Sequence, residues 1–204
     1  MTIWNVARLA GILTFALIAS ACGTSSTADG RLKESTTDYW WREEVKFSTG
    51  EVIVVTRGES RVMRGEMGRG NGLMFYSAWL EADLPGVGKT RWEGTLTPLV
   101  LNVTPKGDWY LIGIVENTDA RLDYKLRRGT RYTAFQLKGK DWQRLSFREL
   151  PEGLQPNLLA YRGALFFTGT AREGQLISLE AKQRLDTLDN VDRQYLYIDR
   201  SRGE

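Results

Sequence analysis

Short strand-like segments recur along most of this chain, and turn residues separate them. Their β-branched and aromatic residues favour extended backbone. We predict nine strands, at residues 39–47, 51–56, 73–80, 92–103, 109–115, 131–137, 141–147, 165–170 and 195–198. Glycine-containing loops at 48–50 and 138–140 predict two hairpins. The expected fold class is mainly β: a single antiparallel β-sandwich or barrel-like domain with one short C-terminal helix.

Three of these segments carry more specific information. Residues 52–55 are all β-branched, which favours a strand that is buried on both faces. Residues 109–115 form the most apolar run and are expected to be a central strand. Pro98 cannot donate a backbone hydrogen bond, so part of segment 92–103 is expected at a sheet edge or a bulge.

One stretch near the C-terminus has a helical pattern. Ser178 is a suitable N-cap for a helix that runs to about Leu188, and Glu180 falls in its first turn. Ala181, Leu185 and Leu188 repeat at helical spacing and form a narrow apolar stripe. The sequence therefore predicts one late helix among the strands.

The N-terminus has the layout of a secretory signal. Arg8 precedes an apolar run at 9–18, and the small residues 19–21 lead into Cys22, the only cysteine of the chain. This arrangement resembles the lipobox of bacterial lipoproteins, although position 19 is alanine where that pattern most often has leucine. The resemblance implies that the Cys22 thiol is diacylated, that cleavage occurs before Cys22, and that the new amino group is usually acylated too.

Two alternatives to a lipoprotein remain, a plain secretory signal and an N-terminal transmembrane anchor. The apolar run is about ten residues long and falls short of the ~20 that span a bilayer, which disfavours the anchor. Gly23 follows the cysteine instead of aspartate. In a Gram-negative cell the lipoprotein sorting pattern then implies the outer membrane, with the protein facing the periplasm.

The resulting domain organisation has three parts. Residues 1–21 are the signal peptide, 22–38 comprise the lipidated cysteine and a tether, and 39–204 form the mostly-β globular domain. The tether is rich in Ser, Thr and Gly and has almost nothing to bury, so we expect it to be flexible. We expect the lipid on Cys22 to anchor the protein in the membrane.

Composition excludes several kinds of chemistry. The chain has no histidine, and acylation of Cys22 leaves no free thiol. Histidine-based triads, imidazole bases, thiol catalysis and most zinc sites are therefore excluded, and we expect no cofactor and no metal. Only Arg8 is lost with the signal, which lowers the net charge from +3 to +2. This near-neutral charge argues against a nucleic-acid partner.

The glycine-rich segment at 57–72 is the most unusual internal stretch. It carries Arg57, Arg61, Arg64 and Arg69 against only two glutamates. One interpretation is a mobile basic loop that binds an anion: a lipid headgroup, a lipopolysaccharide phosphate, a peptidoglycan carboxylate or an acidic protein patch. The alternative is a solvated hairpin extension whose arginines bind nothing specific.

Tryptophan is the second candidate for binding. Most of the tryptophans are expected to pack in the core of a β-domain that has no disulfide. Trp40 and Trp41 are adjacent, and adjacent strand residues face opposite ways, so at least one of them is a candidate aromatic surface. Such a surface can stack on sugar rings.

A phosphate-binding loop is suggested by residues 85–90, PGVGKT, but the match is incomplete. Asp83 stands where the full pattern requires glycine, and the residues after Thr90 have the pattern of a strand instead of a helix. We therefore interpret this segment as a surface turn.

The function expected from these features is a non-enzymatic interaction or scaffold module for an envelope protein complex. The first alternative is a ligand-binding module for peptidoglycan or an anionic glycolipid, and the second is a carboxylate-dependent hydrolase. A module for a protein partner predicts an exposed apolar patch. A ligand binder predicts tryptophan beside arginine in a groove, and a hydrolase predicts a deep pocket with two close carboxylates of unequal pKa.

Overall fold

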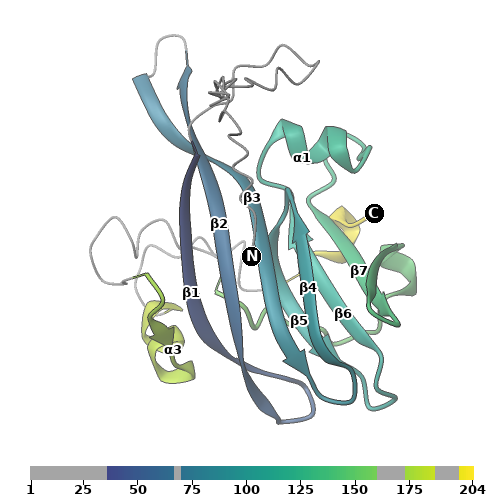
Figure 1. Ribbon diagram of the computed structural model, residues 1–204. Helices are drawn as coiled ribbons and strands as arrows, with labels where there is room; N and C mark the ends of the chain where they lie inside the picture. The colour runs from purple at the N-terminus through teal and green to yellow at the C-terminus, as the bar shows by residue number, and fades with distance from the viewer. Residues whose placement is uncertain (1–35, 67–69, 160–172, 187–197) are drawn as a thin grey trace, which may run out of the picture. The chain divides into compact units, whose positions relative to one another are not determined.

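The computed structural model describes residues 36–66, 70–159, 173–186 and 198–204 (Figure 1). One compact unit contains Glu34–Glu204. This unit is mainly β, and two sheets of largely antiparallel strands pack against each other. The prediction of a mainly-β, sandwich-like domain is therefore confirmed.

The first sheet has five strands in the order β4-β3-β2-β1-β9. Its strands are β1 (Thr36–Lys46), β2 (Val52–Glu66), β3 (Gly70–Leu84), β4 (Gly88–Gly94) and β9 (Leu176–Ile177). The first four follow one another as an antiparallel meander, and the short β9 pairs parallel with β1.

The second sheet is an antiparallel meander of four strands in the order β5-β6-β7-β8. Its strands are β5 (Thr97–Val103), β6 (Trp109–Ile114), β7 (Tyr132–Lys138) and β8 (Asp141–Leu145). The described helices are α1 (Thr118–Asp123), α3 (Leu179–Asp186) and the single-turn 3₁₀ helices η1 (Phe147–Glu149) and η3 (Arg200–Arg202).

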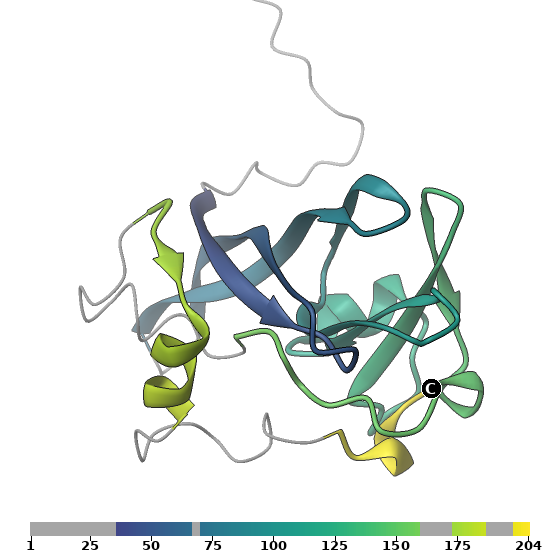
Figure 2. The same cartoon turned by 90° about the horizontal axis from the view of Figure 1, so that it is seen from below.

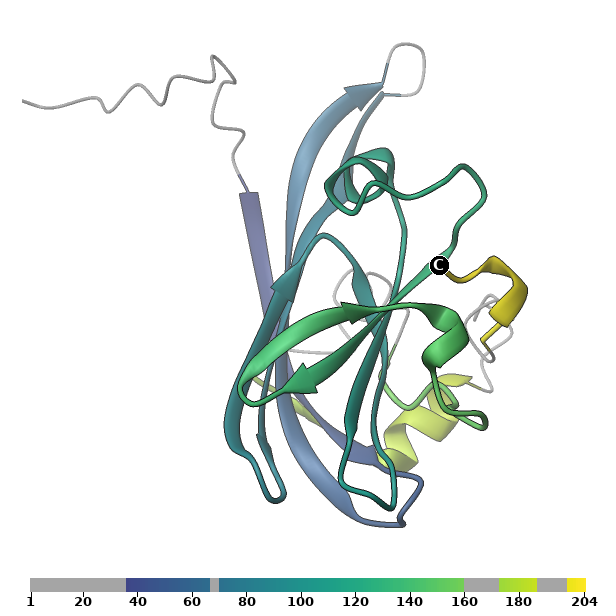
Figure 3. The ribbon, with the colours of Figure 1, turned by 90° about the vertical axis from the view of Figure 1, so that its right-hand side faces the viewer.

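The main core fills the space between the two sheets. Side chains from the first sheet, such as Val45 and Leu80, meet Leu101, Leu111 and Phe135 of the second. Figures 2 and 3 show the purple and blue strands of the first sheet beside the green strands of the second. A smaller cluster on the other face of the second sheet includes Tyr132, Phe147 and Leu150. Strands β5, β6 and β7 of the second sheet are thus largely buried on both faces, whereas β8 is largely exposed and the first sheet keeps an outer face in solvent.

Most of the predicted strands are present, but segment 92–103 is two strands instead of one. The chain leaves the first sheet after Gly94 and enters the second at Thr97. Pro98 lies in β5, the edge strand of its sheet, next to a register irregularity, as its missing N–H predicts. Strand β6 has β5 on one side and β7 on the other and is buried throughout, which confirms the central-strand prediction. Predicted strand 165–170 lies outside the described residues, as do residues 195–197.

The expectation that residues 52–55 are buried on both faces is wrong. Val52 is 43% exposed and Val54 is 47% exposed, whereas Val55 is completely buried. The cause is tertiary, because only the inner face of β2 is covered by a second layer. A β-branched run indicates a strand but does not show which of its faces the fold covers.

The late helix is confirmed as α3. The Ala181 N–H donates to the Ser178 hydroxyl at 3.1 Å, so Ser178 caps the helix as predicted. Helix α1 was not predicted, because it has only six residues. Its signal was the cap Asn117, whose side-chain oxygen accepts a hydrogen bond from the Ala120 N–H at 2.8 Å.

The turn at residues 85–87 joins two antiparallel strands, and Gly86 and Gly88 both have positive φ. Thr90 lies inside β4, so no helix follows the glycines. The interpretation of PGVGKT as a surface turn, and not a phosphate-binding loop, is confirmed.

Asn157 connects the edges of β1 and β5. Its backbone N–H donates to the Leu99 carbonyl at 3.1 Å. Its side-chain oxygen accepts from the Leu101 N–H at 2.9 Å, and its Nδ2 donates to the carbonyls of Leu101 at 2.6 Å and Lys46 at 3.0 Å. One amide therefore satisfies backbone groups of both sheets and closes this side of the sandwich.

Replacement of Asn157 by alanine is expected to lower the free energy of unfolding by about 2–3 kcal/mol, because backbone groups at a part-buried edge lose their partners. Urea unfolding followed by tryptophan fluorescence measures the change. Gln155→Ala is the matched control, since Gln155 is an exposed amide in the same loop. An equal effect of both substitutions would show that Asn157 does not have this bridging role.

Candidate functional site

An ion pair is completely buried between the two sheets. Glu43 of β1 and Arg57 of β2 are each 0% exposed, and Arg57 Nη1 lies 2.5 Å from Glu43 Oε1. Lys182 of α3 places its Nζ 3.2 Å from the other carboxylate oxygen of Glu43. One carboxylate thus contacts two cations from different elements, and we refer to Glu43, Arg57 and Lys182 as the buried ion cluster.

Backbone groups complete this cluster. Arg57 donates from Nη2 to the Pro98 carbonyl at 2.9 Å and from Nη1 to the Leu159 carbonyl at 3.2 Å. The Leu159 N–H donates to Glu43 Oε2 at 3.0 Å, and Lys182 Nζ donates to the Asn157 carbonyl at 2.8 Å. The cluster therefore joins β1, β2, β5, α3 and the segment before residue 160.

The electrostatic balance keeps Glu43 ionised. Burial by itself disfavours the charge of Glu43, but the positive charges of Arg57 and Lys182, with hydrogen bonds from Arg57 and the Leu159 N–H, lower its pKa below the ordinary value. A general acid for hydrolysis needs a raised pKa instead. Glu43 is consequently a buried anion that joins the elements of the cluster, and it does not have the pKa of a general acid.

The second buried carboxylate is also matched by an arginine. Glu59 of β2 is 1% exposed, and Arg61 Nε lies 2.9 Å from its Oε1. Arg57 comes between Glu43 and Glu59 on the inner face of the sheet, so the two carboxylates do not form a dyad. Among the described residues, no group of three or more His, Cys, Asp or Glu side chains could hold a metal ion.

The four predicted anion-binding arginines do not lie together in one site. Arg57 is in the interior, where Glu43 is already its anion, and Arg61 is half-buried against Glu59. Arg64 lies in the part of β2 that pairs with β3, but the position of its side chain is not described. Arg69 lies outside the described residues. Residues 57–66 and 70–72 are strands of a β2–β3 hairpin, as in the hairpin alternative (Figure 1). Cys22 also lies outside the described residues.

Sequence reasoning missed Glu43 and Lys182. Strand alternation gave a signal for Glu43, because it lies between Trp41 and Val45 on the buried side of β1, and all three are 0% exposed. Lys182 had no comparable signal, since the sequence does not show which strand α3 contacts.

The two adjacent tryptophans face opposite ways. Trp41 is 0% exposed and lies 5.3 Å from the Arg57 guanidinium, inside the domain. Trp40 is 40% exposed on the outer face of the first sheet. Of the predicted aromatic surface, therefore, only Trp40 is accessible.

Trp40 belongs to a row of residues that crosses the outer face of the sheet. Gly58, Trp79 and Glu93 lie opposite one another on the next three strands. A Cβ at Gly58 would lie 2.4 Å from the Trp79 indole, so this glycine is what allows the indole to rest flat on β2. The Arg91 guanidinium lies 4.8 Å from the Trp79 ring and is paired with Glu81 and Glu93.

Exposed apolar side chains gather on this face. Trp40, Val52 and Val54 all point outward from β1 and β2, and the partly buried Trp79 and the stem of Arg91 continue the surface over β3 and β4. We refer to Trp40, Val52, Val54, Trp79 and Arg91 as the Trp40 face. Leu176, 41% exposed on β9, lies opposite Arg42 and adds to its margin. The row of Arg42, Thr56 and Glu81 crosses this face between Trp40 and Trp79 on one side and Val54 on the other, so the apolar side chains form two neighbouring groups. Exposed apolar surface of this kind is characteristic of binding sites.

No protein-family model, curated protein or solved structure matches this chain. In the part of the chain that the structure describes, none of the helices has the length and apolar character to cross a membrane.

Glu43→Gln is expected to lower the free energy of unfolding at neutral pH by about 3–5 kcal/mol, because Arg57 and Lys182 lose their buried counter-charge. The folded-state pKa of Glu43 is below 4.5, so its ionised form contributes stability above pH 4.5. That contribution is lost as the pH falls through the folded-state value, and the variant should lack this part of the acid sensitivity.

Urea unfolding of wild type and Glu43→Gln, repeated from neutral pH to about pH 3, measures this difference. Glu152→Gln is the control, since Glu152 is exposed. Parallel pH profiles for wild type and Glu43→Gln would contradict the assignment of Glu43 as a structural anion.

Proposed function

We propose that this protein is a lipid-anchored envelope lipoprotein whose β-domain is a non-enzymatic interaction module, with the Trp40 face as its binding surface for a protein partner. The observation that carries this proposal is the gathering of Trp40, Val52 and Val54 on one solvent-facing side of a sheet. In a Gram-negative cell, the sequence after Cys22 supports a position at the outer membrane, facing the periplasm.

The residue types on the Trp40 face favour a protein partner. Tryptophan, tyrosine and arginine are the side chains that most often dominate the binding energy of protein interfaces. On this face the charged residues Arg42 and Glu81 lie between Trp40 and Val54, so a partner would meet apolar and charged side chains together. Trp79 is already held against Gly58, so ordering its side chain on binding has little entropic cost.

The buried ion cluster supports a non-enzymatic role. Its carboxylate is held ionised by two cations and has no raised pKa that would suit proton transfer. Glu43 serves the packing of the sheets, and the surface that we assign to a protein partner is the outer face.

A second candidate is the binding of peptidoglycan or an anionic glycolipid. Trp79 lies beside Arg91 on an exposed sheet, which is the pairing expected of such a module. Arg91 is engaged by Glu81 and Glu93, however, so its charge is already matched. The same surface serves both candidates, and the experiment below separates them.

The length of chain before β1 is consistent with a role close to the membrane. Thirteen residues, 23–35, separate Cys22 from β1, and they can span at most about 45 Å. A domain held at this distance meets partners that lie on or near the same membrane, where tethering raises the effective concentration.

The combined variant Trp40→Ala and Val54→Thr should reduce partner capture by the lipidated, tagged protein crosslinked in intact cells by about tenfold or more. Quantitative mass spectrometry of the captured proteins provides the measurement. Leu122→Ser is the matched control, because Leu122 is 69% exposed on α1 and lies off this face. Equal recovery from the face variant and the wild type would refute the proposed surface.

Co-sedimentation with purified peptidoglycan tests the second candidate with the same variants. Retention of the wild type, together with its loss in the face variant, would identify the ligand as glycan and contradict the choice of a protein partner. The favoured proposal predicts that neither protein sediments.

Cys22→Ser should move the protein from the membrane fraction to the soluble fraction, because the two or three acyl chains are its expected anchor. Cell fractionation and immunoblotting measure the distribution. A variant that remained in the membrane fraction would show that Cys22 does not carry the anchor.

A further inference from the structure

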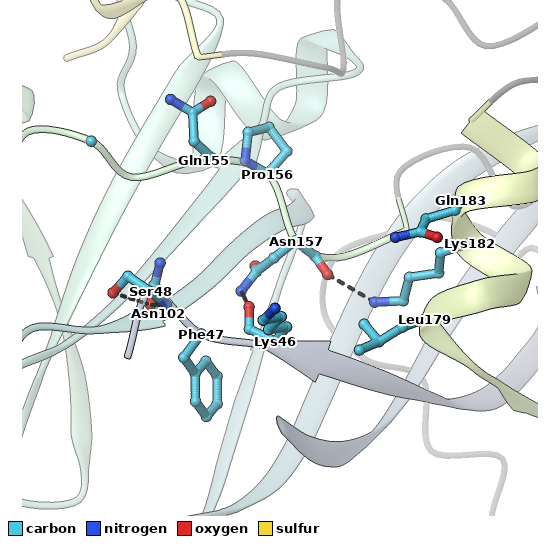
Figure 4. Close-up of a pocket in the computed structure, with 11 residues that line it drawn as sticks. Lys46, Phe47, Ser48, Asn102, Gln155, Pro156, Asn157, Leu179, Lys182 and Gln183 are labelled. Atoms are coloured by element: carbon cyan, nitrogen blue, oxygen red, sulfur yellow. Dashed lines mark hydrogen bonds between the residues drawn. The ribbon is translucent and has the colours of Figure 1, made fainter. Parts of the chain in front are cut away.

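A pocket of about 450 Å³ opens where the end of β1, strand β5, the loop at 153–157 and helix α3 meet. Its volume lies within the range that is usual for small-molecule sites. Figure 4 shows Lys182 and Gln183 reaching from α3 toward Asn157, with Lys46 on the strand below. The pocket shares no residue with the Trp40 face.

The charges around this pocket have one sign. Lys46 and Lys182 are the charged residues of its described lining, and no acidic side chain accompanies them there. Lys46 is exposed and has no ion-pair partner among the described residues. Lys182 shares the Glu43 carboxylate with Arg57, so these three side chains carry one positive charge in excess, and Lys46 adds a second. The resulting positive potential attracts an anion.

The remaining polar lining consists of neutral hydrogen-bonding groups. The Asn102 side chain is 4% exposed, and its Oδ1 accepts from the Ser48 N–H at 3.0 Å and the Ser48 hydroxyl at 3.1 Å. Because these bonds fix the amide, its orientation is set before any ligand arrives. Gln183 adds a second amide from α3. Amides of this kind suit a ligand that carries hydroxyl or amide groups next to its acidic group.

The cationic side of the pocket is held in place by the buried ion cluster. Lys182 Nζ contacts Glu43 Oε2 at 3.2 Å and the Asn157 carbonyl at 2.8 Å. The ammonium is thereby fixed at the inner wall instead of extending into solvent. Because surrounding contacts already order this charged donor, less side-chain entropy is lost when a ligand binds.

We propose that this pocket binds a small molecule with a carboxylate or phosphate group, which lies against Lys46 and Lys182, and with hydroxyl or amide groups, which Asn102 and Gln183 recognise. This is a second binding site, which adjoins the Trp40 face where Lys46 lies opposite Val52. Its failure would leave the proposed protein interface unaffected, because the two surfaces are tested with different variants.

Isothermal titration calorimetry of the lipidated protein in detergent, with two probes, tests this site. Inorganic phosphate represents phosphate-bearing ligands, and muramyl dipeptide represents carboxylate-bearing ligands with sugar hydroxyls and amides. N-acetylglucosamine is the uncharged control ligand. Saturable binding of phosphate or muramyl dipeptide, but not of N-acetylglucosamine, is expected, and the probe that binds more tightly indicates the source of the acidic group.

Lys46→Gln should weaken that binding about tenfold, because it removes a charge-assisted hydrogen bond from an exposed side chain that the fold does not need. Lys89→Gln, on exposed β4, should leave the affinity unchanged. Absence of saturable binding for both acidic probes would overturn the proposal. An affinity that fell equally in Lys46→Gln and Lys89→Gln would also overturn it, since binding would then be a general charge effect.

Discussion

The ion pair between Arg57 and Glu43 is the interaction on which the arrangement of this domain depends. Two charges removed from water are costly unless each finds close partners. Here Arg57 reaches from β2 to Glu43 on β1 and to the Pro98 carbonyl on β5, so one guanidinium connects both sheets. Lys182 adds α3 to the same carboxylate. The sheets and the helix are thereby fixed relative to one another at a single buried point.

The two faces of the first sheet differ because this internal connection occupies only one of them. The inner face contains Trp41, Glu43 and Arg57 and is committed to holding the domain together. The outer face does not take part in this packing, and Trp40 and Val54 are exposed on it. Strand alternation thus separates two adjacent tryptophans into a buried packing residue and an exposed residue of the proposed binding surface.

Local sequence signals predicted the elements that depend on one residue or one short pattern. Pro98 at an edge-strand irregularity, Ser178 as a helix cap and the opposite orientation of Trp40 and Trp41 each follow from backbone chemistry. The division of segment 92–103 into two strands was not predictable in this way. Its cause is that the chain changes sheets after Gly94, which no local pattern indicates.

The candidate sites were less predictable because they depend on pairs of residues distant in the sequence. Glu43 and Lys182 meet only after α3 packs beside β1, and the same arginine type is buried at position 57 and half-exposed at position 61. The exposure of Val52 and Val54 likewise depends on which face a second layer covers. The sequence shows which residue types are present, but their burial and their contacts depend on the tertiary fold.

Site-specific photo-crosslinking in intact cells is the most direct test of the proposal that the outer face of the first sheet binds a protein partner. A photoreactive residue in place of Thr56, which lies on β2 between Arg42 and Glu81, samples that face, and one in place of Leu122 samples α1. If that face binds one partner, position 56 gives one discrete protein adduct and position 122 gives none. Adducts from position 122 alone, or no protein adduct from position 56, would contradict it.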